Sequence, residues 1–440
     1  MLNKIRFIFQ DSDFSEIISK AGFFLFFRTL AFLFGYLFAI LVIKYYGVNV
    51  YGFVTLSFTI IMISSVLCRF GFDISLTKVF GIENNSNSFN HYTFSVLSSI
   101  FLSLIFSATL FFLSTEISTL IFSKEEFDIY LKWTALSIPL WTLLLLNTGV
   151  FRGLAKVQYY ATLDNFGRFL LSIVVLGFFL VLNDNNNNYE PIIAHTIGLF
   201  LLLIISFFWI NKVLVSDQKI SLKKSKKFIQ NSFPIMLTSS IVIFLAWSDK
   251  ILLGIFNTEK NLAIYDISMR IATLLTFNLE GINSILSSKI SKFYSEKKMI
   301  ELNRVIQFSS KINIITAIII FLTIFIFSNS ILRFFGNEFL EGQSVLFILL
   351  IGQLCNSYCG PVGNIMLMTG NQVPFRNILA GALILNLVLN FFLIPKFGII
   401  GASIATSLSL IFWNFFGAYY LRKNLQLNSF YWPNLNKKSI

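Results

Sequence analysis

The chain has 440 residues, of which 56% are hydrophobic and only 12% are charged, and its mean hydropathy is +0.75. A soluble domain carries about 25% charged residues, so this chain has too few polar side chains to cover a globule, and a lipid bilayer must be its solvent. The net charge of +13 is compatible with nucleic-acid binding or with an anionic membrane surface, and the position of the basic residues along the chain favours the membrane.

A membrane-spanning helix needs about 20 mostly apolar residues. Twelve stretches in chain order meet this description: 21–43, 52–70, 93–113, 129–150, 166–182, 191–210, 233–256, 262–287, 312–328, 344–367, 377–394 and 400–421. Gly360 and Pro361 lie inside the tenth stretch, and proline removes a helical hydrogen bond, so that helix is expected to end or kink there. The first stretch follows the polar segment QDSDFSE without a small-residue cleavage site, which predicts a retained signal-anchor.

The basic residues set the predicted orientation of these spans. With a cytoplasmic N-terminus, 24 of the 34 lysines and arginines fall in inside segments, five fall in outside segments and five lie within spans. Cytoplasmic loops carry such an excess. Both termini are therefore predicted to be cytoplasmic, and an anionic inner leaflet accounts for the net charge without nucleic acid.

The strongest basic cluster, KKSKK at residues 223–227, lies at the midpoint of the chain with six spans on either side. Equal halves of the same orientation predict two lobes related by an axis along the membrane normal. The predicted fold is an all-α integral membrane protein with about twelve transmembrane helices in two six-helix lobes. The predicted divisions are an N-terminal lobe at 1–210, a basic cytoplasmic linker at 211–232, a C-terminal lobe at 233–421 and a cytoplasmic tail at 422–440.

Charged residues inside spans are costly and are candidates for function. Arg28 lies in the run GFFLFFRTLAFLFGYLFAI, six residues or about 9 Å after Gly22. An arginine at a helix centre costs roughly 2.5–3.5 kcal/mol on insertion, so a leucine would insert better. Arg28 either extends back to the headgroups or faces a polar cavity, and the sequence leaves both open.

A second set of charges lies in spans seven and eight. If residues 257–261 form the turn of a helical hairpin, Asp249 and Arg270 lie at about the same depth in the membrane. Asp266 precedes Arg270 by four residues, the spacing of an ion pair within one helix, and Lys250 points away from Asp249 around its helix. The set is either a structural brace or the wall of a polar cavity.

Other charged residues receive structural interpretations. Lys132 and Arg168 lie near span ends and are expected to extend to the membrane interface. Asp73 follows Arg69 by four residues and is expected to pair with it.

The chain shows no sign of catalytic or metal chemistry. Cys68, Cys355 and Cys359 lie in or beside apolar segments and are interpreted as small packing residues, since two histidines are too few to complete a metal site. The sequence contains no Walker loop in a strand–helix setting and no HExxH motif. No catalytic residue, metal ligand or cofactor is therefore predicted.

Two C-terminal stretches resemble a known family. They are GPVGNIMLMTGNQ at residues 360–372 and NLVLNFFLIPKFGIIGASIATSLS at residues 386–409, and YYGVNVYGF at 45–53 and FRGLAK at 151–156 match less specifically. The matching positions in the second stretch are Asn386, Asn390, Pro395, Gly398, Gly401, Ala402, Ala405 and Thr406. The chain resembles the polysaccharide flippases of the superfamily that also holds multidrug and toxin extrusion transporters and lipid II flippases.

The resemblance implies alternating access, in which two lobes rock about a central cavity. The implied cargo is an oligosaccharide repeat unit linked by pyrophosphate to a polyprenol, for O-antigen, capsule or a similar polymer at a bacterial inner membrane. Arg28 and Arg270 match cavity-lining positions of related flippases, and with Lys250 and Asp249 they form the predicted substrate-binding set. The implied partners are this cargo, membrane lipids and other polysaccharide-assembly membrane proteins, and a monomer is expected.

Two competing functions remain. An ion-coupled drug exporter of the same fold would use Asp249 or Asp266 as a proton or cation site, although the first lobe lacks a clear acidic cluster. A membrane enzyme such as a glycan polymerase or an acyltransferase is disfavoured by the short loops, because polymerases usually carry one long outside loop.

Overall fold

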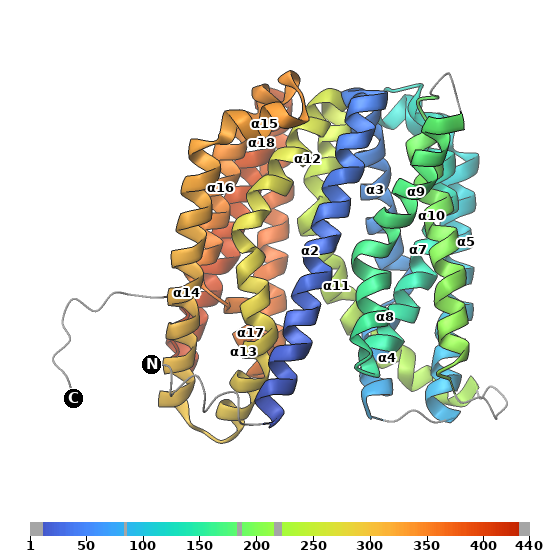
Figure 1. Cartoon of the computed structure of the whole chain (residues 1–440). Helices are drawn as coiled ribbons and strands as arrows, with labels where there is room; N and C mark the ends of the chain where they lie inside the picture. Colours follow the sequence, from blue (N-terminus) through green and yellow to red (C-terminus); the bar gives the residue numbers. More distant parts are fainter. Residues whose placement is uncertain (1–11, 83–85, 183–186, 215–221, 431–440) are drawn as a thin grey trace. The chain divides into compact units, whose positions relative to one another are not determined.

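The computed structural model describes residues 12–82, 86–182, 187–214 and 222–430, and every regular element in these ranges is a helix (Figure 1). The chain divides into two compact units. The first unit is Gly22–Ala263, and the second is Ile264–Ile440 together with Met1–Ala21. Two helices, α2 (Ser12–Tyr46) and α12 (Glu259–Thr273), contribute residues to both units.

Between these two helices, the first unit follows the predicted order of apolar stretches. Its elements are α3 (Val48–Arg69), α4 (Phe72–Ile82), α5 (Ser86–Phe112), α6 (Ser114–Glu116), η1 (Ile117–Ile121), α7 (Phe127–Gly153), α8 (Val157–Ala161), η2 (Thr162–Phe166), α9 (Gly167–Leu182), α10 (Glu190–Asn211) and α11 (Leu222–Phe256). The predicted fifth span, 166–182, corresponds to α9, and a bend directly before it joins α9 to an additional helical segment. Residues 157–164 and 167–182 meet at an angle of 51°, where the hydropathy is interrupted by Asp164 and Asn165.

The long helix α11 packs within the first unit. The Ser232 hydroxyl lies 2.7 Å from that of Ser75 on α4. Gly71, in the turn between α3 and α4, approaches α11 so closely that an added Cβ would lie 2.7 Å from the Ser232 carbonyl oxygen. Because these contacts tie α11 to α3 and α4, the compact units divide at Ala263 and Ile264, whereas the sequence places the lobe boundary in the linker at 211–232. The functional lobe boundaries stay a prediction.

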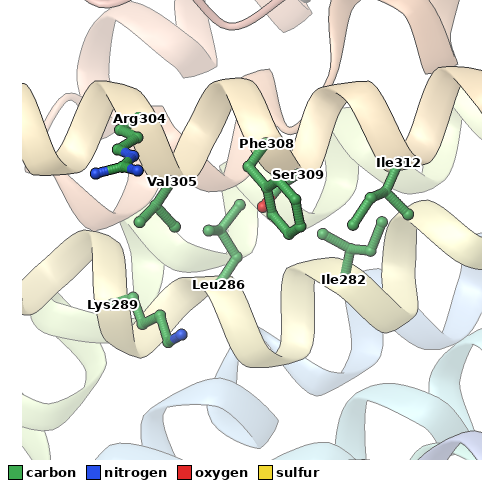
Figure 2. A pocket seen from close by; sticks show the side chains of 8 residues that line it. All are labelled: Ile282, Leu286, Lys289, Arg304, Val305, Phe308, Ser309 and Ile312. Carbon is green, nitrogen blue, oxygen red and sulfur yellow. The ribbon is translucent and has the colours of Figure 1, made fainter. Parts of the chain in front are cut away.

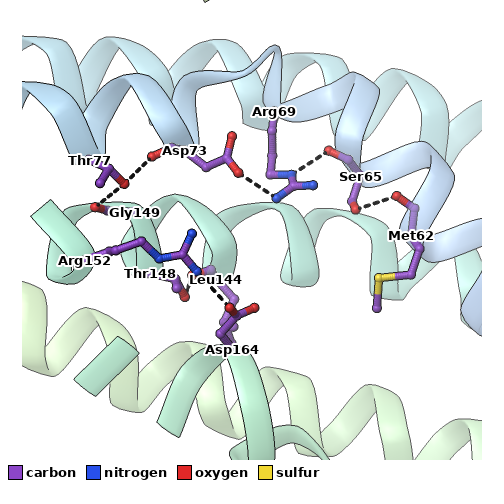
Figure 3. Close-up of polar contacts among 10 residues, drawn as sticks. All are labelled: Met62, Ser65, Arg69, Asp73, Thr77, Leu144, Thr148, Gly149, Arg152 and Asp164. Carbon is purple, nitrogen blue, oxygen red and sulfur yellow. Dashed lines mark hydrogen bonds and ion pairs between the residues drawn. The ribbon is translucent and has the colours of Figure 1, made fainter. Parts of the chain in front are cut away.

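Polar contacts join α3, α4 and α7 at one end of the first unit (Figure 3). The Arg69 guanidinium pairs with Asp73 at 2.9 Å, which confirms the predicted ion pair. Thr77 on α4 donates to the Gly149 carbonyl oxygen on α7 at 2.9 Å. Arg152 at the end of α7 pairs with Asp164 of η2, also at 2.9 Å. These contacts fix the positions of the short segments that follow α3 and α7.

The second unit continues from α12 to α18. Its remaining elements are η3 (Leu274–Thr276), α13 (Phe277–Ser295), α14 (Met299–Ile326), α15 (Ser328–Phe335), η4 (Asn337–Gly342), α16 (Gln343–Cys359), α17 (Val362–Met368) and α18 (Gln372–Leu425). Helix α16 ends at Cys359, directly before the Gly360–Pro361 pair, and Gly360 has φ of 75°. The predicted break in the tenth span is confirmed.

The 54 residues of α18 form a hairpin of two helical arms. A straight helix of this length would be roughly 80 Å long, yet the Tyr420 hydroxyl lies 3.0 Å from the amide oxygen of Asn371. The reversal occurs at Gly398, whose φ of 57° and ψ of −132° lie outside the helical region. Glycine adopts such angles because it has no Cβ. The two arms correspond to the last two predicted spans.

Ten described helices are long and apolar enough to cross a membrane, or eleven when the bent pair counts as one span. Because the last of these is the hairpin α18, its two arms bring the number of crossing segments to the predicted twelve. The all-helical membrane fold is therefore confirmed. The cytoplasmic location of the termini stays a prediction.

Candidate functional site

Arg28 lies on a face of α2 that also carries aromatic side chains. Phe32 and Tyr36 follow it at intervals of four residues, which places the three on one side of the helix. All three are partly buried, and the rings of Phe32 and Tyr36 stack with centroids 6.4 Å apart. This face of α2 therefore presents a guanidinium and two aromatic rings, one of which carries a hydroxyl.

Arg168 occupies an environment that the sequence did not indicate. Its guanidinium carbon lies 4.7 Å from the centroid of the Trp141 ring and 4.5 Å from that of Phe169, and both rings are buried. Such stacking is favourable because the ring faces are electron-rich. Arg168 lies just after the bend that precedes α9, and the expectation that it extends to the membrane interface stays a prediction.

Trp141 adds a hydrogen-bond donor beside Arg168. Its indole nitrogen is buried and donates to no acceptor among the described residues. A buried tryptophan N–H usually finds a partner. The indole is therefore a buried donor without a described acceptor, and its ring stacks against the Arg168 guanidinium.

The ring of Phe166 joins the elements that carry the two arginines. It stacks on Phe27 of α2 with centroids 5.3 Å apart and on Phe34 at 6.1 Å. Phe27 precedes Arg28 directly, and Phe166 precedes Arg168 by two residues. Helix α2 thus contacts η2 at Phe166, and it also contacts α9, where the rings of Phe38 and Phe169 lie 5.8 Å apart. Arg28 and Arg168 lie on α2 and α9.

Asp249 and Lys250 lie on α11 and are almost fully buried, with 1% and 6% of their surface exposed. A carboxylate oxygen of Asp249 accepts a hydrogen bond from the backbone N–H of Lys250 at 2.8 Å. The Lys250 ammonium lies 4.1 Å from the centroid of the Trp247 ring. Burying a charge requires compensating interactions, and both side chains have them.

Asp266 and Arg270 form the predicted ion pair on α12. The Arg270 Nε atom lies 2.6 Å from a carboxylate oxygen of Asp266, whose side chain is 1% exposed against 25% for Arg270. The neighbouring Tyr265 hydroxyl lies 3.0 Å from that of Thr406 on α18. This pair belongs to the second unit, whereas Asp249 belongs to the first, so the expected common depth of Asp249 and Arg270 stays a prediction.

Other polar groups are buried in places where they serve packing. Asn386 and Asn390, which lie in the family-like stretch, are fully buried on the first arm of α18, and Asn390 donates to Asn386 at 3.0 Å. His195 is buried against the Phe58 ring at 4.3 Å, and its ring nitrogen lies 3.1 Å from the Ser172 hydroxyl. The described residues contain no group of three or more histidines, cysteines or acidic residues that could hold a metal ion.

Sequence comparisons place the chain among membrane proteins of glycan assembly. The model of a family described as polysaccharide biosynthesis protein matches residues 17–285, and the MatE model matches residues 234–392. A protein from Haloferax volcanii named as a probable low-salt glycan biosynthesis flippase is 27% identical over 67% of this chain. The chain spans 61% of the length of that relative.

Solved structures share the fold at lower identity. The lipid II flippase MurJ in an inward closed conformation has a TM-score of 0.75 and 17% identity, covering 92% of this chain and 88% of MurJ. An inward-facing multidrug resistance transporter of the MATE family has a TM-score of 0.69 and 13% identity, covering 91% of this chain and 94% of the transporter. The curated relative is named as a flippase, and these two solved structures are a flippase and a transporter. Because its model matches more than half of the residues, the chain belongs to the polysaccharide biosynthesis protein family.

Proposed function

We propose that the chain flips a lipid-linked oligosaccharide from the inner to the outer leaflet of the cytoplasmic membrane. The observation that carries the proposal is the contact in the first unit between α2, which carries Arg28, and the segment η2–α9, which carries Arg168. The family and the flippase name of the Haloferax volcanii relative support the same activity. Flipping moves a molecule without making or breaking a covalent bond, so no cofactor is implied.

The chemistry of the cargo matches these side chains. A polyprenyl-pyrophosphate oligosaccharide has an anionic group, a polar glycan and an apolar tail. Arginine forms paired, charge-assisted hydrogen bonds with phosphate oxygens, and in this proposal Arg28 and Arg168 contact the pyrophosphate. Trp141 and Tyr36 supply flat rings with polar groups, which suit the glycan.

We call Arg28, Tyr36, Trp141 and Arg168 the first-unit cargo wall. Residues outside this wall have supporting roles in the proposal. Arg270, which pairs with Asp266, contributes a further cation in addition to Arg28 and Arg168. Lys250 and Asp249 contribute one positive and one negative side chain on α11. Two lobes alternate in opening the cavity inward and outward. The proposed setting is a bacterial inner membrane with O-antigen, capsule or a related polymer as the product. The proposed assembly is a monomer working beside other polysaccharide-assembly membrane proteins.

An ion-coupled multidrug exporter is the second candidate, favoured by the MatE match and by the buried carboxylate of Asp249. This function needs an acid that takes up and releases a proton or cation during transport. Asp266 is less suited to that role, because its carboxylate is already paired with Arg270. The two candidates differ in which molecules accumulate when the protein is lost.

The test is deletion of the gene followed by analysis of the lipid-linked oligosaccharides in right-side-out spheroplasts. Complete repeat units are expected to accumulate, shielded from a membrane-impermeant glycan oxidant, and surface polymer is expected to disappear. An unchanged lipid pool with altered drug sensitivity would indicate the exporter. Complete but unpolymerised units at the outer face would contradict both transport candidates.

Complementation then tests the two arginines. Arg28→Ala and Arg168→Ala are expected to restore little surface polymer while the protein reaches the membrane at the wild-type level. Arg333→Ala is the control, because Arg333 is exposed on α15 and has no role in the proposal. Full activity of both alanine variants would overturn the assignment of the first-unit cargo wall.

A further inference from the structure

The second unit contains an open pocket of about 420 Å³ between α13 and α14. Its two basic lining residues, Lys289 from α13 and Arg304 from α14, lie at one end of the pocket (Figure 2). Ile282 and Ile312 lie at the opposite end. The pocket therefore has one cationic end and one apolar end.

The apolar part of the pocket is a trough that opens to the protein surface. Leu286 forms its floor and is only 3% exposed, whereas Phe308 and Ile312 at its side are 64% and 39% exposed. Exposed apolar side chains on a membrane-spanning helix meet lipid chains rather than water. The open side of the trough is therefore lined by apolar side chains that suit contact with a lipid chain.

The cationic end lies where headgroups are expected. Lys289 follows the candidate span that ends at Asn283, and Arg304 lies in the second turn of α14. The short connection between the two helices carries Lys297 and Lys298, so the positive-inside rule predicts that this end faces the cytoplasm. Burial lowers the pKa of Lys289 below its ordinary value.

We propose that this pocket binds an anionic phospholipid of the cytoplasmic leaflet, with the phosphate at Lys289 and Arg304 and one acyl chain in the trough. Charge complementarity selects an anionic headgroup, because a zwitterionic lipid would bring a third positive group next to Lys289 and Arg304. The trough selects an amphiphile over a soluble phosphate, since burying apolar surface on both partners is favourable. The site is formed by residues of the second unit that are not part of the proposed first-unit cargo wall, and it does not depend on the identity of the cargo.

A bound lipid would contact α13 and α14 together and so stabilise their pairing. The test uses the full-length protein purified in detergent, with melting temperature recorded against added phosphatidylglycerol, phosphatidylcholine or glycerol phosphate. Phosphatidylglycerol is expected to raise the melting temperature, and the other two probes are expected to have little effect. The double variant Lys289→Gln/Arg304→Gln should weaken the apparent affinity for phosphatidylglycerol by roughly ten- to thirty-fold.

Matched variants separate this site from general attraction to positive charge. Lys292→Gln/Lys297→Asn removes the same charge from exposed positions outside the pocket and should bind phosphatidylglycerol like the wild type. Val305→Trp fills the trough but keeps both cations, and it should weaken lipid binding several-fold.

Three results would overturn the proposal. The first is equal phosphatidylglycerol binding by the wild type and the Lys289→Gln/Arg304→Gln variant. The second is an equal shift with glycerol phosphate, which would indicate a site for a soluble anion. The third is an equal shift with phosphatidylcholine, which would indicate a nonspecific lipid surface.

Discussion

Arg168 and Arg270 are both partly buried within apolar helices, but they have different neighbours. Arg168 of the first unit lies against the rings of Trp141 and Phe169. Arg270 of the second unit forms a 2.6 Å ion pair with Asp266 on its own helix. An aromatic ring supports a guanidinium without cancelling its charge, whereas a carboxylate neutralises it. The comparison suggests that the first unit provides the stronger attraction for an anionic cargo.

Exchanging each arginine for alanine tests this comparison with the largest expected effect. A charge-assisted contact contributes about 1.5–3 kcal/mol, so Arg168→Ala should lower transport roughly ten- to a hundred-fold. Arg270→Ala should lower it less, because Asp266 already compensates the charge. Export of surface polymer per unit of membrane-inserted protein measures both. A larger loss of transport in Arg270→Ala than in Arg168→Ala would contradict this comparison.

The ion pair itself should matter more for stability than for transport. Asp266→Asn removes the charge that pairs with Arg270, and the expected loss in unfolding free energy is about 1–3 kcal/mol. Thermal unfolding in detergent measures the loss. Asp266→Asn/Arg270→Gln should recover part of it, since no unpaired charge remains. An unchanged melting temperature for the single variant would show that the pair contributes no net stability.

Substitutions of Trp141, whose ring lies against the Arg168 guanidinium, test the comparison further. A cation–π contact contributes about 0.5–2 kcal/mol, so Trp141→Leu should reduce transport by a few-fold or more. Trp141→Phe keeps a ring face and should retain more activity than leucine, although it loses the indole N–H. Equal activity of the two variants would indicate that the ring only fills space.

The smallest effect is expected at the half-exposed pair of Arg152 and Asp164, whose side chains are 46% and 31% exposed. Solvent-accessible ion pairs contribute about 0–1 kcal/mol. Asp164→Asn should therefore change the melting temperature much less than Asp266→Asn does. An equal decrease in melting temperature for Asp164→Asn and Asp266→Asn would mean that burial does not explain the contribution of the Asp266–Arg270 pair to stability.

Much of the fold follows from the sequence, because the bilayer imposes a length and an apolar composition on each span. The hairpin of α18 illustrates this: Gly398 separates two apolar runs in the sequence and is also the residue at which the helix reverses. The pairs Arg69–Asp73 and Asp266–Arg270 were predictable for the same kind of reason, since a four-residue spacing makes neighbours on a helix.

The environment of Arg168 could not be predicted in this way. Its aromatic neighbour Trp141 lies 27 residues earlier on another helix, and hydropathy carries no information about such contacts. In the sequence, Arg168 lies near the start of the apolar run 166–182. In the structure, a bent helical segment precedes this run and begins at residue 157. The membership of α11 in the first compact unit likewise depends on packing between distant helices.

The central claim is that this chain moves a pyrophosphate-linked oligosaccharide across a bilayer and that Arg28 and Arg168 contact the pyrophosphate. The most direct measurement reconstitutes the purified protein in vesicles with a polyprenyl-pyrophosphate oligosaccharide on the inner leaflet, with and without proton or sodium gradients. An impermeant glycosidase outside the vesicles reports arrival at the outer leaflet. The account predicts time-dependent cleavage with the wild type and the Arg333→Ala control, and little with Arg28→Ala or Arg168→Ala. Cleavage no faster than in protein-free vesicles under every gradient would contradict it.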